Sequence, residues 1–432
     1  MSSAAQTGAN DAAWEVLFER HEILQHIVRD GRYVISADDI RKEREPRLMA
    51  KFDHRVNLPA IFKTHRLAIV PVTRGSYVIA PYEVYERFPP DEAGAPTRLA
   101  LPSHLQSLRP DKIISETMAV NCALNAGMLA DFLQEEGLCA TVSGRMGSED
   151  FTYRIRNALT NGYDTVAVQG AQIEIDAAFE GAASLALLEA KRDVAEDFLV
   201  RQLYYPFRRW HSKVAKPVRL VYLVYTNGIF HLYEYAFLEP DNYSSLQLVR
   251  QKRYTLEDTR ITRSDLRNAA RRCPVEEEPP IPFPQANNFR RVINLCELLA
   301  QGELSREQIT QQYAFDVRQT NYYTDAARYL GLVEKSGGKS VSYRLSADGC
   351  AIMDMGYRQR QLALCARILR HRVFAQLFAE SLAHGAPLDQ ESIVAVMRSN
   401  ALYHVGSENT RRRRASTVYS WLNWMLQLAG NG

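Results

Sequence analysis

Residues 172–191 read QIEIDAAFEGAASLALLEAK, and this stretch decides the expected fold. QIEID alternates apolar and acidic residues, which predicts a strand with Glu174 and Asp176 on one face. LALLEAK predicts a second strand, in which Glu189 and Lys191 are two residues apart and project from the same side. Because only AAFEGAAS separates the two strands, they are expected to pair as a hairpin. That pairing would bring Asp176 beside Glu189 and Lys191.

These three residue types together suggest metal-assisted chemistry. Two neighbouring carboxylates repel each other when both are ionised, and a divalent cation removes that cost. Oxygen ligands without His or Cys favour Mg²⁺, with Mn²⁺ as a substitute. A lysine ammonium beside them can orient a water or stabilise the charge that builds on phosphorus, so the set suits phosphodiester hydrolysis.

The alternative is that these residues are ordinary solvated charges, since the D-x(12)-E-x-K spacing is frequent by chance. The apolar context of LLEAK favours a functional pair. A charged pair in an otherwise apolar strand costs free energy unless it has a partner or a task.

The run IEIDAAFEG followed by LALLEAKRDVAEDFLVRQLYYPFRRW, ending at Trp210, resembles the core of the PD-(D/E)XK nuclease superfamily. More narrowly, it is similar to a group of type II restriction endonucleases in which a D-x(n)-E-A-K core precedes a helix reading RQLYYP[FY]R. The likeness covers about 140–240, including GRMGSEDFTYRI at 144–155. It implies an α+β fold with a mixed sheet flanked by helices. It also implies that Asp176 and Glu189 bind the metal and that Lys191 is the catalytic lysine.

The resemblance also bears on several secondary candidates. Ile175, rather than proline, precedes Asp176, and Glu174 competes for the ligand role only in a different register. A helix is expected over 194–210, and there Arg201 and Gln202 either brace the site or touch phosphate, or have only a structural role in the helix. Glu116 opens a helix expected over 115–136, capped by Ser115, and is either an accessory acid or a charge favoured by the helix dipole. Arg145 and Ser148 either contact phosphate or shape a turn.

The C-terminal part has a different pattern. VEEEPPIPFPQ at 275–285 predicts an extended linker, and residues 289–345 have winged-helix form, similar to the module found after the core in the same enzyme group. Ser305 and Gln308 form a capping-box pattern at the second helix. The third helix would enter the major groove, and a phosphate contact would come from the wing. The DNA-contact candidates are Arg318, Gln319, Asn321 and Tyr322 for bases, and Lys335, Lys339 and Arg344 for phosphate. A winged helix can instead serve dimerisation.

Composition sets the wider limits. The chain has 432 residues, a net charge of +3 and six cysteines without paired ligand spacing, which disfavours a zinc site or a disulfide framework. Residues 286–432 hold 18 Lys and Arg against 12 Asp and Glu, which suits a polyanion partner. No secretory signal or membrane-spanning run is recognised, so a cytoplasmic location is expected. The expected division is an N-terminal α+β region, a nuclease core, a linker, a winged helix and a helical region, at 1–140, 141–274, 275–288, 289–350 and 351–432.

Taken together, the sequence predicts a prokaryotic type II restriction endonuclease that uses Mg²⁺ to cut double-stranded DNA and leaves 5′-phosphate ends. A homodimer and a cognate DNA methyltransferase are the expected partners. Base recognition can also come from the N-terminal region, where His54, Arg55, Lys63, His65, Arg66 and Arg74 are otherwise taken as surface charges. The alternatives are a DNA-repair or structure-specific nuclease, and a non-catalytic winged-helix regulator.

Overall fold

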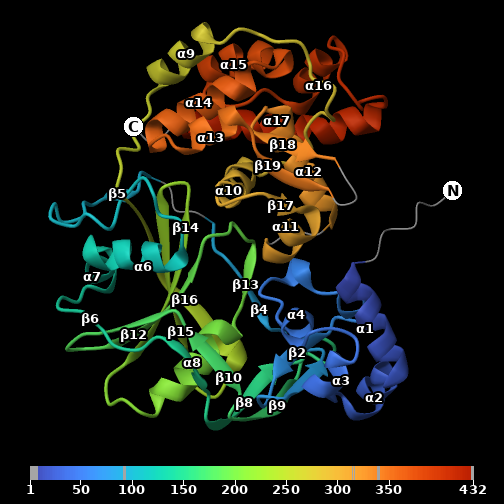
Figure 1. Cartoon of the computed structure of the whole chain (residues 1–432), viewed down its shortest axis with the longest axis vertical. Coiled ribbons are helices and arrows are strands. Elements are labelled where there is room, and N and C mark those ends of the chain that lie inside the picture. The colour runs from blue at the N-terminus through green and yellow to red at the C-terminus, as the bar shows by residue number, and fades with distance from the viewer. Residues whose placement is uncertain (1–7, 91–93, 314, 316, 338–340, 430–432) are drawn as a thin grey trace.

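The centre of the fold is a seven-stranded mixed sheet in the order β5-β16-β15-β14-β12-β11-β6. The computed structural model describes residues 8–90, 94–313, 315, 317–337 and 341–429 (Figure 1). β12 runs parallel to β14 and β16 runs parallel to β5, while the other neighbours are antiparallel. In sheet order the strands are Thr97–Arg98, Leu246–Thr255, Ile229–Phe237, Val218–Thr226, Leu185–Lys191, Ala177–Glu180 and Cys139–Ala140.

Helices cover both faces of this sheet, which explains why β12 is almost entirely buried. α6 (Glu116–Asn125) and α7 (Met128–Leu133) pack on the face that carries Ala186, Leu188 and Ala190. α8 (Arg201–His211) packs on the opposite face with Leu185 and Leu187. By strand alternation, Glu189 and Lys191 lie on the α8 face.

The helix expected over 115–136 is two helices. Ser115 caps the first as predicted, and its side chain accepts from the Met118 amide at 3.1 Å. The chain then breaks at Gly127, which has a φ of +75°, a left-handed conformation that glycine adopts without strain. The helix expected over 194–210 starts later than predicted, because β13 (Asp197–Leu199) first pairs with β4 (Tyr85–Arg87).

The predicted hairpin exists, but its first strand is not QIEID. β11, which begins at Ala177, pairs antiparallel with β12, and Ala177 lies opposite Leu188. β10 (Gln172–Ile175) pairs instead with β7 (Gly144–Gly147), and Asp176 lies at the break between β10 and β11. The two strands between β7 and β10 in the chain are β8 (Asp150–Arg156) and β9 (Tyr163–Gln169), and they pair with each other as a hairpin.

Residues before the sheet form a separate N-terminal unit with its own core around Trp14 and Phe62. A three-stranded sheet, β1-β3-β2, lies within it. Its elements are α1 (Ala9–Arg20), α2 (Ile23–Asp30), β1 (Tyr33–Ser36), α3 (Ala37–Arg41), α4 (Pro46–Ala50), η1 (Arg55–Asn57), α5 (Ala60–Thr64), β2 (Ala68–Pro71) and β3 (Ser76–Ala80). Since β5, α6 and α7 belong to the central sheet and its cover, the boundary expected at 140 falls inside the central unit.

The C-terminal unit is mainly helical and lies above the other two units in Figure 1. The expected linker is irregular, but it is anchored rather than free, because Phe283 is buried and the Glu276 amide donates to the Arg370 carbonyl at 2.8 Å. α9, which precedes the linker, packs with this unit through Leu266. Its helices are α9 (Arg263–Arg272), α10 (Phe289–Leu299), α11 (Arg306–Gln312), α12 (Val317–Tyr329), α13 (Ala347–Met353), α14 (Tyr357–Leu369), α15 (Arg372–His384), α16 (Gln390–Arg398) and α17 (Glu408–Gln427).

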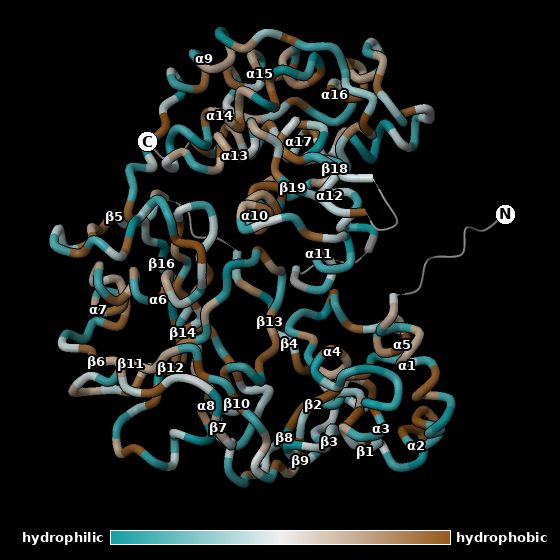
Figure 2. Tube along the Cα trace, in the orientation of Figure 1, coloured by the Kyte–Doolittle hydropathy of each residue, from teal (hydrophilic) through white to brown (hydrophobic). Residues whose placement is uncertain are grey.

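Within that unit, α10, α11 and α12 accompany a small sheet in the order β17-β19-β18. Its strands are Leu304–Ser305, Ser342–Leu345 and Val333–Ser336. The capping box at Ser305 and Gln308 is confirmed. α10 is a mostly brown, apolar stretch in Figure 2, and its apolar side chains are buried in the core of the C-terminal unit. In the part of the chain described above, no helix is both long and apolar enough to cross a bilayer.

Candidate functional site

Asp176, Glu189 and Lys191 meet at the C-terminal end of β12. The Ala190 amide donates to Asp176 Oδ2 at 2.8 Å, which holds this carboxylate against the strand. Lys191 Nζ donates to Glu189 Oε1 and, at 3.1 Å, to the Ala190 carbonyl. The break between β10 and β11 turns Asp176 toward β12. Asp176 therefore lies beside this strand end, where the predicted hairpin also placed it, although QIEI pairs with β7 and not with β12.

Gln202, on the first turn of α8, joins the same group. Its Nε2 donates to Glu189 Oε1 at 2.7 Å, so Glu189 Oε1 accepts from both an amide and an ammonium. Gln202 Oε1 is buried and has no hydrogen-bond partner among the residues that the structure describes. The same holds for the buried hydroxyl of Tyr222, which lies opposite Glu189 in the parallel pair of β12 and β14. Two polar atoms beside the cluster are therefore available to a ligand or a water.

The electrostatics of the cluster show an excess of negative charge. Burial raises the pKa of Glu189 to about 7, and the charge of Asp176 adds to this effect while Lys191 opposes it. Burial acts against the charge on Lys191, but Glu189 and other nearby acidic groups outweigh it, so the pKa of Lys191 lies well above its ordinary value. Burial also raises the pKa of Glu116, whose carboxylate senses Lys191 and Asp176. One ammonium therefore faces several carboxyl groups.

A buried ion pair lies next to this cluster. His54 Nε2 lies 2.9 Å from Asp193 Oδ2, and its Nδ1 lies 2.6 Å from the Asp197 carbonyl oxygen. Burial would lower the pKa of His54, but the charge and hydrogen bond of Asp193 raise it to about 9, so the ring is an imidazolium at neutral pH. The expectation that His54 is a surface charge is wrong, because only 6% of the residue is exposed.

Of the other site residues predicted for the central unit, Glu116 lies beside the cluster, and the rest make contacts with other parts of the protein. Glu116 lies beside the cluster at the start of α6. Glu174 lies outside it and pairs with Arg145 at 3.3 Å, with both side chains half exposed. Arg201 sits over the Tyr205 ring at 5.6 Å. Ser148 is buried, and its hydroxyl donates to the Glu149 carbonyl at 2.8 Å, so its partner in the structure is protein.

The DNA-contact candidates of the C-terminal unit do not join the cluster. Arg318, Gln319, Asn321 and Tyr322 lie on α12, where Arg318 is exposed and the other three are half-buried. Lys339 lies outside the described residues.

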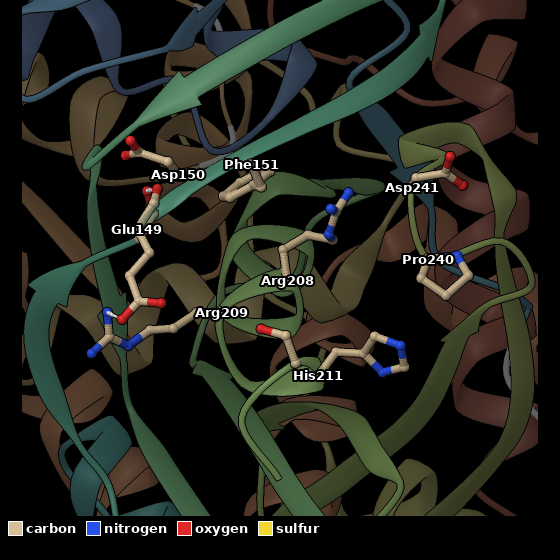
Figure 3. A pocket seen from close by; sticks show the side chains of 10 residues that line it. Glu149, Asp150, Phe151, Arg208, Arg209, His211, Pro240 and Asp241 are labelled. Carbon is tan, nitrogen blue, oxygen red and sulfur yellow. Dashed lines mark hydrogen bonds and ion pairs between the residues drawn. The ribbon is translucent and has the colours of Figure 1, made fainter. Parts of the chain in front are cut away.

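Two cavities flank the central unit. One, of about 300 Å³, is lined by Glu116, Asp193 and Arg192 and by residues of α10, so it opens between the cluster and the C-terminal unit. The other, of about 350 Å³, lies at the end of α8 (Figure 3). Its arginines already have protein partners, since Arg208 donates to the Thr152 carbonyl at 3.0 Å and Arg209 pairs with Glu149 at 3.5 Å.

Three family models match the chain. Each is described only as a domain of unknown function. DUF6996 matches residues 11–79, DUF6997 matches residues 80–255 and DUF7226 matches residues 291–430. No curated protein and no solved structure matches the chain. The three matched ranges follow the N-terminal, central and C-terminal units, and the cluster lies within DUF6997.

Sequence reasoning did not single out Asp193 and did not assign a partner to His54. A local signal existed for Asp193, which follows Lys191 by two residues in LEAKRD. The histidine carries no such signal, because it lies 139 residues earlier in the chain than Asp193.

Proposed function

We propose that this chain is a metal-dependent endodeoxyribonuclease, and more narrowly a type II restriction endonuclease of the PD-(D/E)XK kind. The observation that carries the proposal is the convergence of Asp176, Glu189 and Lys191 at one strand end, with Gln202 bonded to Glu189. The mixed sheet flanked by helices supports the same assignment.

Asp176 and Glu189 would hold a divalent cation, and their chemistry fits Mg²⁺. Both are hard oxygen donors, and Mg²⁺ commonly binds through one or two carboxylates while waters and substrate phosphates fill its other positions. Among the residues that the structure describes, no three His, Cys, Asp or Glu side chains form a ready-made metal group, so the protein would supply these two. When bound, the cation would polarise a phosphoryl oxygen and lower the pKa of a water.

The protein groups have separable roles in this reaction. Lys191 stays protonated, so its ammonium stabilises negative charge on the phosphoryl oxygens and orients the attacking water rather than removing its proton. Gln202 fixes the rotamer of Glu189 through the 2.7 Å hydrogen bond. In-line attack of water on phosphorus then breaks the bond to the 3′ oxygen and leaves a 5′-phosphate.

The wider proposal concerns DNA and partners. α10 to α12 with the small sheet have the order of a winged helix, which would place α12 in the major groove of double-stranded DNA. With one site per chain, a double-strand cut needs either two copies or sequential nicking of the two strands, and we propose a homodimer. A restriction role would pair the enzyme with a DNA methyltransferase in the cytoplasm of a prokaryote.

The test is digestion of methylation-free plasmid and phage DNA with Mg²⁺ or Mn²⁺. Wild type is compared with Lys191→Ala and Asp176→Ala, and Lys252→Ala is a matched control because Lys252 pairs with Asp131 away from the cluster. We expect discrete fragments from wild type and Lys252→Ala, and a loss of at least about 100-fold in rate for the other two variants. A smear lost in both site variants would favour a repair or structure-specific nuclease. DNA binding without any cleavage would refute the nuclease and favour a regulator.

A further inference from the structure

The segment 192–197 connects the end of the site strand to β13 and α8. It follows Lys191 directly, and it leads through β13 to the turn of α8 that holds Gln202. Glu189 and Lys191 occupy the last three positions of β12, so they have the support of the sheet on one side only. The position of their backbone therefore depends on what holds 192–197.

The C-terminal unit holds this segment from one side. Asn294, on α10, is 2% exposed, and its side chain accepts from the Val194 amide at 2.8 Å and donates to the Arg192 carbonyl at 2.8 Å. Arg291, one turn earlier, donates to the Val194 carbonyl at 3.1 Å. Tyr313 donates to Asn294 Oδ1, which fixes the amide in this orientation.

The N-terminal unit holds the same segment from the other side. His54 bonds to the Asp193 carboxylate and to the Asp197 carbonyl, and the Arg55 amide donates to Asp197 Oδ1 at 3.0 Å. The two flanking units also touch each other, because Asn57 Nδ2 donates to the Tyr313 carbonyl at 3.1 Å. All three units therefore meet at one segment, which begins directly after Lys191 of the candidate catalytic cluster.

We infer that His54 and Asn294 are positioning residues, which clamp the segment 192–197 from the two flanking units and thereby hold Glu189 and Lys191 in place. This inference rests on the proposed function for its catalytic consequence, but the clamp itself is a structural property. The clamp links the cluster to both units proposed to contact DNA. Displacement of reacting groups by about 1 Å costs on the order of 100-fold in rate, so small movements of this segment are sufficient to matter.

The experiment uses the full chain with His54→Gln and, as a second variant, Asn294→Asp, which keeps the acceptor for the Val194 amide and removes the donor to the Arg192 carbonyl. The matched control is His371→Gln, because His371 is also buried, at 5% exposed, but stacks on Tyr329 in the C-terminal unit. Thermal unfolding shows which variants fold. If Asn294→Asp does not fold, the test rests on His54→Gln alone. Hydrogen exchange of peptides spanning 189–197, DNA affinity and the single-turnover cleavage rate are then measured.

We expect exchange in 189–197 to rise at least about tenfold in the clamp variants and to stay unchanged in His371→Gln. The cleavage rate should fall about 10- to 100-fold while DNA affinity changes less than about threefold, since the clamp acts on the reacting groups rather than on binding. Unchanged exchange, or raised exchange with an unchanged rate, would overturn the inference. If wild type does not cleave DNA at all, the proposed function fails, and the exchange result alone then decides whether the clamp exists.

Discussion

The ion pair of His54 with Asp193 makes a quantitative prediction about stability. The pKa of His54 lies at about 9 in the folded protein, against an ordinary value of 6.5. Burial of the ring acts against its charge, so the increase comes from Asp193 and, to a lesser extent, from the Asp197 carbonyl and the Asp53 charge. His54→Gln removes this proton site.

The sign follows from the direction of the pKa change. A folded-state pKa above the unfolded value means that the folded state retains the proton longer, so the stabilisation is fully present below pH 6.5 and is lost as pH rises to about 9. Each pH unit in this window removes about 1.4 kcal/mol, which amounts to about 3 kcal/mol over the window. Above it, the contribution of His54 is constant.

Urea denaturation from about pH 6 to about pH 9.5 measures this effect as the difference in free energy of unfolding between wild type and His54→Gln. His371→Gln is the control, because burial lowers the pKa of His371 to about 4. That histidine is neutral in both states from about pH 7.5 upward, so its difference from wild type should not depend on pH between there and about pH 9. A flat profile for His54→Gln would refute the assignment of a buried imidazolium bound to Asp193.

Three further predictions concern the metal, a glycine and a tryptophan. At pH 8, Mg²⁺ at about 100 times its Kd should stabilise wild type by about 2.7 kcal/mol. The same Mg²⁺ concentration should stabilise it less at pH 6, where Glu189 holds a proton. If Mg²⁺ raises the melting temperature of Glu189→Gln as much as that of wild type, Glu189 is not a ligand. Gly349→Ala should lower the free energy of unfolding in urea by about 1–3 kcal/mol, because a Cβ there would collide with the Leu332 carbonyl. The control is Gly75→Ala, whose Cβ would contact nothing within 4 Å and which should leave the stability nearly unchanged. Equal losses in the two variants would be inconsistent with this packing. Trp421→Phe should cost about 1–3 kcal/mol, since its Nε1 donates to the buried Ala286 carbonyl at 2.7 Å, and a variant with the stability of wild type would exclude that role.

Several local features of this protein followed from the sequence alone. The alternation in LALLEAK placed Leu187, Glu189 and Lys191 on one face of a strand, because successive side chains of any strand point to opposite sides. The helix caps at Ser115 and Ser305 were predictable, because each serine hydroxyl accepts a hydrogen bond from a backbone amide that lies just three residues later in the chain. Asn227 and Gly228 form the two-residue turn between β14 and β15, and both have the positive φ that an Asn-Gly turn favours.

Only the tertiary structure decided the surroundings of the cluster. Asp176 reaches the Ala190 amide because the chain breaks between β10 and β11. The position of this break goes with the pairing of β10 with β7, and the alternation in QIEID does not specify that partner strand. His54 and Asn294 contact residues 192–197 from units that are distant in the chain. The spacing of residues within a single strand or helix does not indicate such contacts. Strand alternation and helix capping act over a few residues, whereas burial of a histidine beside an aspartate depends on how three units of the chain pack together.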